Sequence, residues 1–219
     1  MIIAVDGPAA SGKGTLGRRL AQHFQLAHLD TGKLYRAAAL HALAAGGDPA
    51  DPGVARAAAE RVRASDLDNP RLRDEDVARA SSVVAAIAAV RHALLAFQRD
   101  FARRPPAPGG AVLDGRDIGT VVCPDADAKL FVTATLEARA RRRFKELQEN
   151  GGNAIYERVL QDMKDRDARD SQRRAAPLVP ADDAFVLDTT ALDADAALAA
   201  ALDFIGRKLA GKPPRQGRS

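Results

Sequence analysis

The sequence predicts an α/β domain in which helices flank a parallel sheet. Short apolar runs alternate along the chain with longer segments of helical periodicity, which is the pattern of strand–helix–strand units. The first apolar run ends in a glycine-rich loop that leads directly into a helix. The length of 219 residues and the hydrophobic fraction of 46% suit one domain with a sizeable core, so we expect residues 1–219 to form a single domain.

The first part of the chain supplies two strand–helix pairs. Residues 2–6 (IIAVD) form a continuous apolar run, as expected of a buried parallel strand, and a helical pattern follows over residues 13–24. Residues 27–30 (AHLD) predict a second, shorter strand. The alanine-rich segment 31–47 predicts a helix that ends at two glycines, and residues 76–103 are again helical in character.

The second part of the chain continues the alternation. Three more strands are predicted by the short apolar runs at 111–114 (AVLD), 128–134 (AKLFVTA) and 184–190 (AFVLDTT). Residues 135–174 predict two highly charged helices that are joined at NGGN (150–153), and residues 194–209 predict a final amphipathic helix. Because helices separate consecutive strands, the sheet is expected to be parallel.

Two segments carry no strand pattern. Residues 48–75 are polar and arginine-rich, contain three prolines and show no alternation of apolar and polar residues, so we expect no β-hairpin there. The last residues, 211–219 (GKPPRQGRS), combine glycine, proline and charge, and a disordered tail is expected.

Composition and charge exclude several classes of protein. The net charge of +4 favours anionic partners, but an aromatic fraction of 4% offers few platforms for stacked nucleic-acid bases, so we expect no nucleic-acid partner. The N-terminal sequence has the pattern of neither a signal peptide nor a membrane span, so no membrane association is expected. The single cysteine, Cys123, excludes a disulfide framework and indicates a reducing, cytoplasmic location.

Residues 7–15 (GPAASGKGT) form the clearest functional motif. Gly7 and Gly12 allow backbone N–H groups to turn toward phosphate oxygens, and Lys13 can reach the outer phosphates. A tight strand-to-helix turn with a solvated lysine is the weaker interpretation, because strand, loop and helix occur in the order that a phosphate loop needs. The predicted ATP-binding residues are Gly7, Pro8, Ala9, Ala10, Ser11, Gly12, Lys13, Gly14 and Thr15.

The position after Lys13 distinguishes this loop from the usual one. Most such loops carry a hydroxyl there as a magnesium ligand, whereas this chain has Gly14 and carries the hydroxyl on Thr15. We expect Mg²⁺ as the cofactor, held mainly by phosphate oxygens and water near Thr15 and not by a set of protein ligands. The four histidines lack the spacing of metal ligands, so no protein-bound zinc is expected.

Gly-Lys-Gly-Thr resembles the variant of this loop in nucleoside monophosphate kinases, and the remaining motifs resemble bacterial-type cytidylate kinase. The match is collinear and covers nearly everything except residues 48–75 and the tail. Its motifs are LDTGKLYR (29–36), SSVVAAIAAVRHALL (81–95), LDGRDIGT (113–120), DAKLFVTATLEARARRR (127–143), DRDARDSQR (165–173) and APLVPADDAFVLDT (176–189).

The resemblance implies a P-loop kinase core, an acceptor-nucleotide-binding region and a helical lid. The core would comprise residues 1–30, 105–134 and 175–210, the acceptor-binding region residues 31–104, and the lid residues 139–172. The family usually carries a small β insert in the acceptor-binding region. Here residues 48–75 are too short and lack its pattern, so the insert is expected to be shortened.

The resemblance also assigns roles in the acceptor site. Asp117, Arg91 and Ser82 match the residues that read the cytosine base, and Arg166 and Asp170 match those that hold the ribose. The complete set predicted to bind CMP is Thr31, Tyr35, Arg36, Ser82, Arg91, Arg116, Asp117, Arg166, Asp170 and Arg173.

Arginines dominate the predicted site because phosphoryl transfer between two nucleotides gathers many negative charges. Catalysis then consists mainly of positioning and charge neutralisation. By resemblance, Arg36, Arg116 and Arg173 hold phosphate. Four more arginines crowd residues 139–143 and would repel one another unless an anion neutralises them. The residues expected to be catalytic are Lys13, Arg142, Arg143 and Arg173.

Spacing constrains the base-reading residues. The sequence DGRD (114–117) follows a buried strand, at the edge where open α/β sheets bind ligands. Ser82 and Arg91 would lie on opposite faces of one unbroken helix, about 13 Å apart along its axis. They converge only if the chain bends, yet Ala88-Ala89 stand where the family often has Pro-Arg, so the usual cue for a break is missing.

These features predict ATP-dependent phosphorylation of CMP and dCMP to CDP and dCDP by direct in-line transfer. The predicted partners are ATP and CMP or dCMP, and the chain is expected to be a monomer. One alternative is a P-loop kinase for another small acceptor, such as UMP or shikimate. A second is a P-loop switch or a nucleic-acid-dependent ATPase, which turnover of ATP with CMP alone would exclude.

Overall fold

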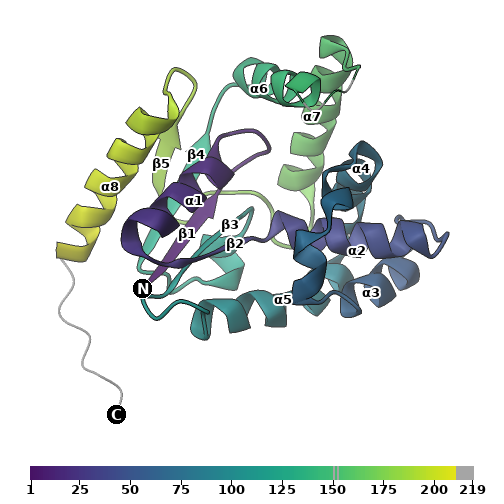
Figure 1. Ribbon diagram of the computed structural model, residues 1–219, viewed down its shortest axis with the longest axis horizontal. Helices are drawn as coiled ribbons and strands as arrows, with labels where there is room; N and C mark the ends of the chain where they lie inside the picture. The colour runs from purple at the N-terminus through teal and green to yellow at the C-terminus, as the bar shows by residue number, and fades with distance from the viewer. Residues whose placement is uncertain (150, 152, 211–219) are drawn as a thin grey trace.

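The computed structural model describes residues 1–149, 151 and 153–210, and Figure 1 shows a central sheet with helices on both sides. The five strands pair in parallel in the order β2-β3-β1-β4-β5. They are β1 (Ile2–Asp6), β2 (Ala27–Asp30), β3 (Ala111–Gly115), β4 (Ala128–Thr133) and β5 (Phe185–Asp188). The predicted α/β class and parallel sheet are therefore confirmed, while the predicted tail at 211–219 lies outside the described residues.

The helices form a layer on each face of the sheet and a separate pair above its carboxyl edge (Figure 1). One layer consists of α1 (Lys13–Phe24) and α8 (Ala194–Ala210). The other consists of α2 (Gly32–Ala44), α3 (Pro52–Glu60), α4 (Glu75–Val84) and α5 (Ala88–Arg103). The separate pair is α6 (Leu136–Glu149) and α7 (Tyr156–Gln172), which has a small apolar core of its own.

Alternate residues of two inner strands, β1 and β3, supply the two main cores. Ile3 and Val5 of β1 are fully buried against α1 and α8, whereas Ala4 between them is buried against the helices of the other layer. In β3, Val112 and Leu113 divide between the two layers in the same way. Successive side chains of a strand point to opposite faces, so continuous apolar runs are required when both faces are covered.

The carboxyl ends of three strands meet at one edge of the sheet. The register pairs Asp6 of β1 with Gly115 of β3, and Asp30 of β2 with Asp114 of β3. Parallel strands end at the same edge, so these three aspartates lie near the glycine-rich loop that follows β1. This is the edge at which open α/β sheets bind ligands.

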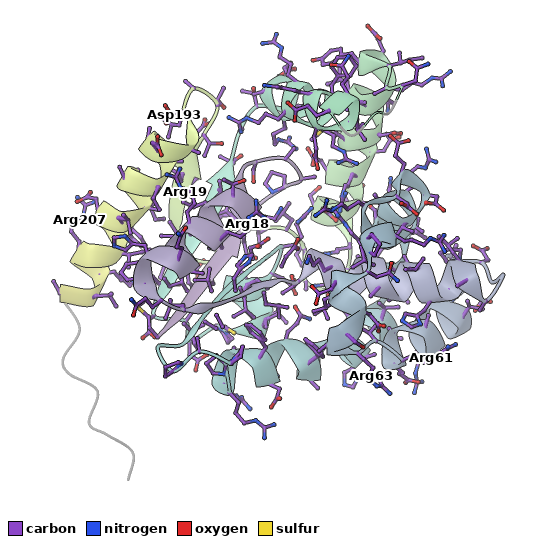
Figure 2. The ribbon with its side chains drawn as sticks, viewed as in Figure 1. Arg18, Arg19, Arg61, Arg63, Asp193 and Arg207 are labelled. Atoms are coloured by element: carbon purple, nitrogen blue, oxygen red, sulfur yellow. The ribbon has the colours of Figure 1, made fainter. Side chains whose placement is uncertain are left out.

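Residues 48–75, all of which are described, contain no strand. The segment instead forms α3 and two short 3₁₀ helices, η1 (Ala64–Asp68) and η2 (Pro70–Arg73). Side chains of α2 hold it in place, because Lys33 Nζ donates to the carbonyl oxygen of Leu67 at 3.0 Å. Its exposed residues Arg61 and Arg63 lie at the periphery of the molecule (Figure 2).

The predicted helical segment at 76–103 is divided into α4 and α5, which meet at a bend of 100°. The break occurs without a proline, because Ile87 has an extended backbone (φ −83°, ψ 118°). Val84 before the bend and Val90 after it are both fully buried in the same apolar core. We infer that burial of both helices against one core stabilises the bend. No local sequence pattern predicts it.

Asp6 links the end of β1 to the segment after β3. Its two carboxylate oxygens accept hydrogen bonds from the backbone N–H groups of Ile118 (2.8 Å) and Gly119 (2.7 Å), which begin the short π-helical turn η3 (Ile118–Val122). Burial of the side chain raises the pKa of Asp6 to about 6, and the two hydrogen bonds only partly oppose this shift.

The Asp6→Asn variant should therefore gain stability relative to the wild type as pH rises. Because the pKa of Asp6 is higher in the folded than in the unfolded protein, Asp6 stabilises the fold at pH values below its unfolded-state pKa. This contribution is lost as pH rises through about 6, the folded-state pKa. The difference in free energy of unfolding between the two proteins should shift by roughly 2–3 kcal/mol in favour of Asp6→Asn between pH 3.5 and pH 7.5. Urea denaturation at several pH values measures it, and a difference independent of pH would contradict the assignment.

Candidate functional site

The glycine-rich loop has a backbone that requires its glycines. Gly7 has φ +151°, and a Cβ atom there would lie 2.0 Å from the carbonyl oxygen of Val132 on β4. Gly12, with φ +87°, is in the left-handed region directly before α1. Thr189 supports the loop from the other side, because its hydroxyl donates to the carbonyl oxygen of Ser11 at 2.9 Å. The loop is thus held by β4 and by the segment after β5.

Lys13 lies at the start of α1, and its one hydrogen-bond acceptor within the described residues is the carbonyl oxygen of Pro8 at 3.3 Å. Burial lowers the pKa of Lys13 to about 7, and the positive charge of Arg116 lowers it further. The carboxylates of Asp114 and Asp30 act in the opposite direction. An ammonium group with so little neutralisation favours an anion as its missing partner.

Four arginines from different elements form a cationic cluster with Lys13. Arg36 comes from α2, Arg116 follows β3, Arg143 belongs to α6 and Arg166 belongs to α7. Burial lowers the pKa of Arg166 to about 9, with the charges of Arg116, Arg36 and Arg143 adding to the effect. The buried Nε of Arg166 has no hydrogen-bond partner among the described residues. A polyanion such as a phosphate chain would relieve both the repulsion and the missing hydrogen bond.

Asp170 of α7 partly balances this cluster. Its Oδ2 accepts a hydrogen bond from Arg116 Nε at 2.9 Å, and both side chains are largely buried. Although burial opposes ionisation, the charges of Arg116 and Arg166 lower the pKa of Asp170. The ion pair sets the orientation of the Arg116 guanidinium at the strand edge.

A second buried group surrounds Asp117. Arg91 of α5 forms an ion pair with the Asp117 carboxylate, and its guanidinium lies 5.3 Å from the centre of the Tyr35 ring. Arg173 Nη2 lies 4.0 Å from the other Asp117 oxygen and has no hydrogen-bond partner in the part of the chain that the structure describes. The structure thus brings together Asp117, Arg91, Tyr35 and Arg173, which the sequence analysis selected from four separate segments.

Two other predicted residues are already engaged with the protein. The Thr31 hydroxyl donates to the carbonyl oxygen of Asp114 at 2.8 Å. Ser82 is buried on α4, and its hydroxyl oxygen accepts a hydrogen bond from Arg169 of α7. The sequence analysis did not select Arg169, whose partner is 87 positions away along the chain.

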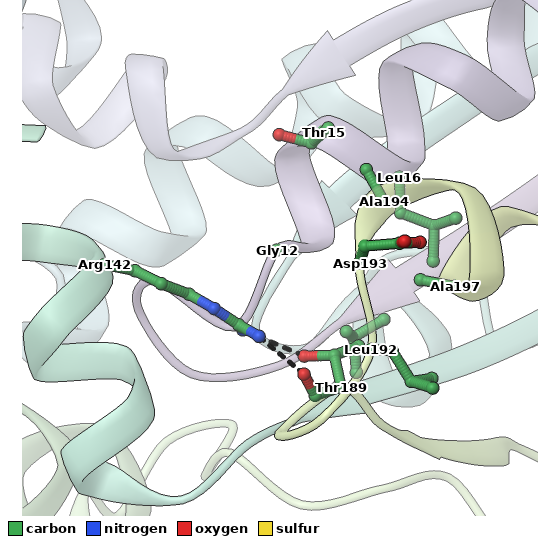
Figure 3. A pocket seen from close by; sticks show the side chains of 10 residues that line it. Gly12, Thr15, Leu16, Arg142, Thr189, Leu192, Asp193, Ala194 and Ala197 are labelled. Carbon is green, nitrogen blue, oxygen red and sulfur yellow. Dashed lines mark hydrogen bonds between the residues drawn. The ribbon is translucent and has the colours of Figure 1, made fainter.

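The arginines of α6 that were predicted to be catalytic have different surroundings. Arg142 Nη1 donates to the Thr189 hydroxyl at 3.0 Å, and Figure 3 shows this side chain reaching from α6 to the wall of a pocket of about 240 Å³. Arg143 pairs with Glu146 at 2.9 Å on the same helix. The pocket is lined by Gly12, Thr15, Leu16, Val132, Arg142, Thr189, Leu192, Asp193, Ala194 and Ala197.

Arg139 requires a correction to the sequence analysis, which expected an external anion to neutralise the arginines at 139–143. Its guanidinium is buried and pairs through both Nη atoms with Asp167 of α7, at 3.1 and 2.6 Å. The compensating acid lies 28 positions away, so inspection of the neighbouring sequence could not identify it.

Asp30 and Asp114 are acidic residues of the site that the sequence analysis did not assign. Both act on the pKa of Lys13, and Asp114 Oδ2 lies 2.7 Å from His28 Nε2. Their positions at strand ends were the available signal. No group of three or more His, Cys, Asp or Glu residues suited to a metal occurs among the described residues. The oxygen atoms of Thr15, Asp30 and Asp114 are the hard donors that Mg²⁺ and its water shell prefer, so the site fits the expected cofactor.

Comparisons of the sequence with known proteins give matches to one family. Residues 3–207 match the family model described as cytidylate kinase. A cytidylate kinase of Paramagnetospirillum magneticum is 60% identical over 207 residues, covering 94% of this chain and 98% of that protein. A cytidylate kinase of Methylocella silvestris is 61% identical over 205 residues, covering 94% of each chain.

An uncharacterized protein from Eubacterium ventriosum has a related solved structure, with a TM-score of 0.51, 15% identity and coverage of 94% of this chain and 98% of that one, and it shows the fold alone. Among the described helices, none is long and apolar enough to cross a membrane by itself, and only α4 and α5 as a bent pair reach that length and composition.

The family model matches residues 3–207, and the two relatives are 60% and 61% identical over almost the whole chain. This chain therefore belongs to the cytidylate kinase family.

Proposed function

We propose that this enzyme transfers the γ-phosphoryl group of ATP to CMP and dCMP, giving ADP with CDP or dCDP. The observation that carries the proposal is the cluster of buried, incompletely neutralised cations between the glycine-rich loop and the Asp117 group. Such a cluster suits two phosphate groups that approach one another from opposite sides. Family membership supports the choice of reaction.

The donor nucleotide fits the side of the site formed by α1, α6 and α8. The base would occupy the pocket beside Arg142 and Leu192, and the phosphates would lie along the glycine-rich loop. Mg²⁺ would supply positive charge between the phosphate groups, with Thr15 and the water-binding carboxylates of Asp30 and Asp114 around it. Lys13 would neutralise the outer phosphates.

The acceptor nucleotide fits the side formed by α2, α5 and α7. Asp117 would accept a hydrogen bond from the cytosine amino group while Arg91 donates to N3 and O2, with Ser82 completing the base site. Arg166 and Asp170 would hold the ribose. Arg36, Arg116 and Arg173 would hold the acceptor phosphate, and Arg143, whose charge acts on Arg36 and Arg166, would stabilise the transferred phosphoryl group together with Arg142.

The proposed regions follow from this division. Residues 31–104 would form the acceptor-binding region, with a shortened insert at 48–75, and residues 139–172 would form a lid whose closure excludes water from the phosphoryl group. We further propose that the enzyme acts as a cytoplasmic monomer and needs no nucleic acid. Steady-state rates with CMP, dCMP, UMP and AMP at fixed Mg-ATP test the substrate assignment. If UMP is phosphorylated and the other three acceptors are not, the alternative of a P-loop kinase for UMP would be favoured.

Lys13→Ala should abolish nearly all phosphoryl transfer without unfolding the protein. Lys13 has one hydrogen-bond acceptor among the described residues, a backbone carbonyl, so its loss removes little structure but leaves the developing charge without its cation. A decrease of kcat by about 10²–10³ is expected. Lys145→Ala, which removes an exposed lysine of α6, is the matched control and should keep full activity. A wild-type thermal melt with unchanged CMP phosphorylation would contradict the role of Lys13.

Asp117→Asn should narrow the preference for CMP over UMP. Uracil sets an acceptor against the carboxylate and an N–H donor against the Arg91 guanidinium, and each mismatched buried group costs about 1–3 kcal/mol. The wild type should therefore prefer CMP by at least about a hundredfold in kcat/KM. An asparagine amide can turn either its donor or its acceptor toward the base, and it also weakens the ion pair with Arg91.

The measurement is kcat/KM for both acceptors with both proteins. Asp117→Asn should lower CMP turnover more than UMP turnover. An equal decrease for the two acceptors would mean that Asp117 orients Arg91 and Arg173 without reading the base.

A further inference from the structure

Arg139 joins three parts of the site that are far apart in the sequence. The side chain is only 7% exposed and lies in the first turn of α6. Its Nε donates to the carbonyl oxygen of Ala134 at 2.9 Å, where the chain leaves β4. Nη1 reaches the carbonyl oxygen of Ala9 in the glycine-rich loop at 3.4 Å, and both Nη atoms bond Asp167 of α7. The planar guanidinium thus contacts the donor loop and the lid at the same time.

Apolar packing reinforces this junction. Ala9 and Ala10 of the glycine-rich loop pack against the core of the lid, which contains Ala140, Val159 and Met163. Ala10 has φ +56°, a left-handed conformation that is unfavourable for alanine and needs support from its surroundings. In Figure 1 the loop between β1 and α1 extends toward α6 and α7. The tip of the donor loop and the lid therefore form one packed unit.

Asp167 connects this unit to the acceptor site through a rigid segment of α7. Arg166 is its neighbour and Asp170 follows one helical turn later, and both are proposed to hold the acceptor nucleotide. Asp170 in turn orients Arg116 through its hydrogen bond at 2.9 Å. A helix moves as a body over so short a length, so a shift of Asp167 moves Arg166 and Asp170 with it.

We propose that Arg139 is a positioning residue that couples occupation of the donor loop to the geometry of the acceptor site. The proposal rests on the proposed function. Donor phosphates that order Ala9 and Ala10 would favour the arrangement in which Arg139 holds Asp167, and this arrangement presents Arg166 and Asp170 to CMP. Coupling between two ligands is reciprocal, so each nucleotide should tighten binding of the other by about 5- to 150-fold.

The test measures binding of CMP by calorimetry, with and without Mg²⁺ and a non-hydrolysable ATP analogue. The ratio of the two dissociation constants should be at least about 5 in the wild type. It should fall toward 1 in Arg139→Lys, because a lysine keeps the charge but cannot bond both oxygens of Asp167. Asp167→Asn, which keeps the shape of the side chain, should lower the ratio in the same way. Arg141→Lys, at an exposed position on the same helix, is the matched control and should retain the wild-type ratio.

A purely structural role predicts a different result. If Arg139 only stabilises the lid, the variants should melt at lower temperature but keep the wild-type ratio, and this outcome would overturn the proposal. A wild-type ratio of 1 would overturn it as well. If one variant does not fold, the ratio of the two CMP dissociation constants measured with the other variant tests the proposal. Wild-type turnover with CMP is measured in parallel, since its absence would overturn the proposed function, whereas unchanged ratios beside normal turnover overturn only the role of Arg139.

Discussion

The site depends on positive charges that are close together and largely removed from water. Lys13, Arg36, Arg116 and Arg166 come from four separate segments, and burial together with mutual repulsion lowers the pKa of Lys13 to about 7 and of Arg166 to about 9. Such an arrangement is unfavourable in itself, because burial penalises charge and like charges repel. It suits a ligand that brings several negative charges, and the fold accordingly places these groups at the open edge of the sheet.

Acidic residues hold the arginines of the proposed phosphate site in position. Asp170 orients Arg116, and Asp117 pairs with Arg91 while lying 4.0 Å from Arg173. Asp30 and Asp114 at the strand ends favour the charged form of Lys13. Fixed donors of this kind need little rearrangement when a ligand binds, which is the condition for electrostatic catalysis. The same carboxylates limit the repulsion among the cationic side chains.

The arginines of α6 differ in their contacts. One is buried and bonded within the protein, and two others lie at the edge of a pocket or pair with an exposed residue. Arg139 is buried and bonded to Asp167, Ala134 and Ala9. Arg142 instead bonds Thr189 at the edge of a pocket, and Arg143 pairs with Glu146, which is more than half exposed. The exposed carboxylate of Glu146 can be exchanged for phosphate at small cost, because exposed ion pairs contribute little net stability. Adjacent residues of one helix can therefore serve different purposes, one joining α6 to α7 and the glycine-rich loop and others lying where the proposed phosphate ligand would bind.

The sequence by itself determined the fold class, the five strands, the glycine-rich loop and Lys13, because apolar periodicity and glycine spacing are local signals. It proposed Arg91, Arg166 and Arg173 as site residues only through family resemblance, since each would otherwise be interpreted as a surface arginine. Tertiary structure alone decided the bend between α4 and α5, the contact of Arg169 with Ser82, and the pairing of Arg139 with Asp167. The bend is stabilised by a core that both helices share, and the two contacts join residues 87 and 28 positions apart, so no local pattern along the chain encodes them.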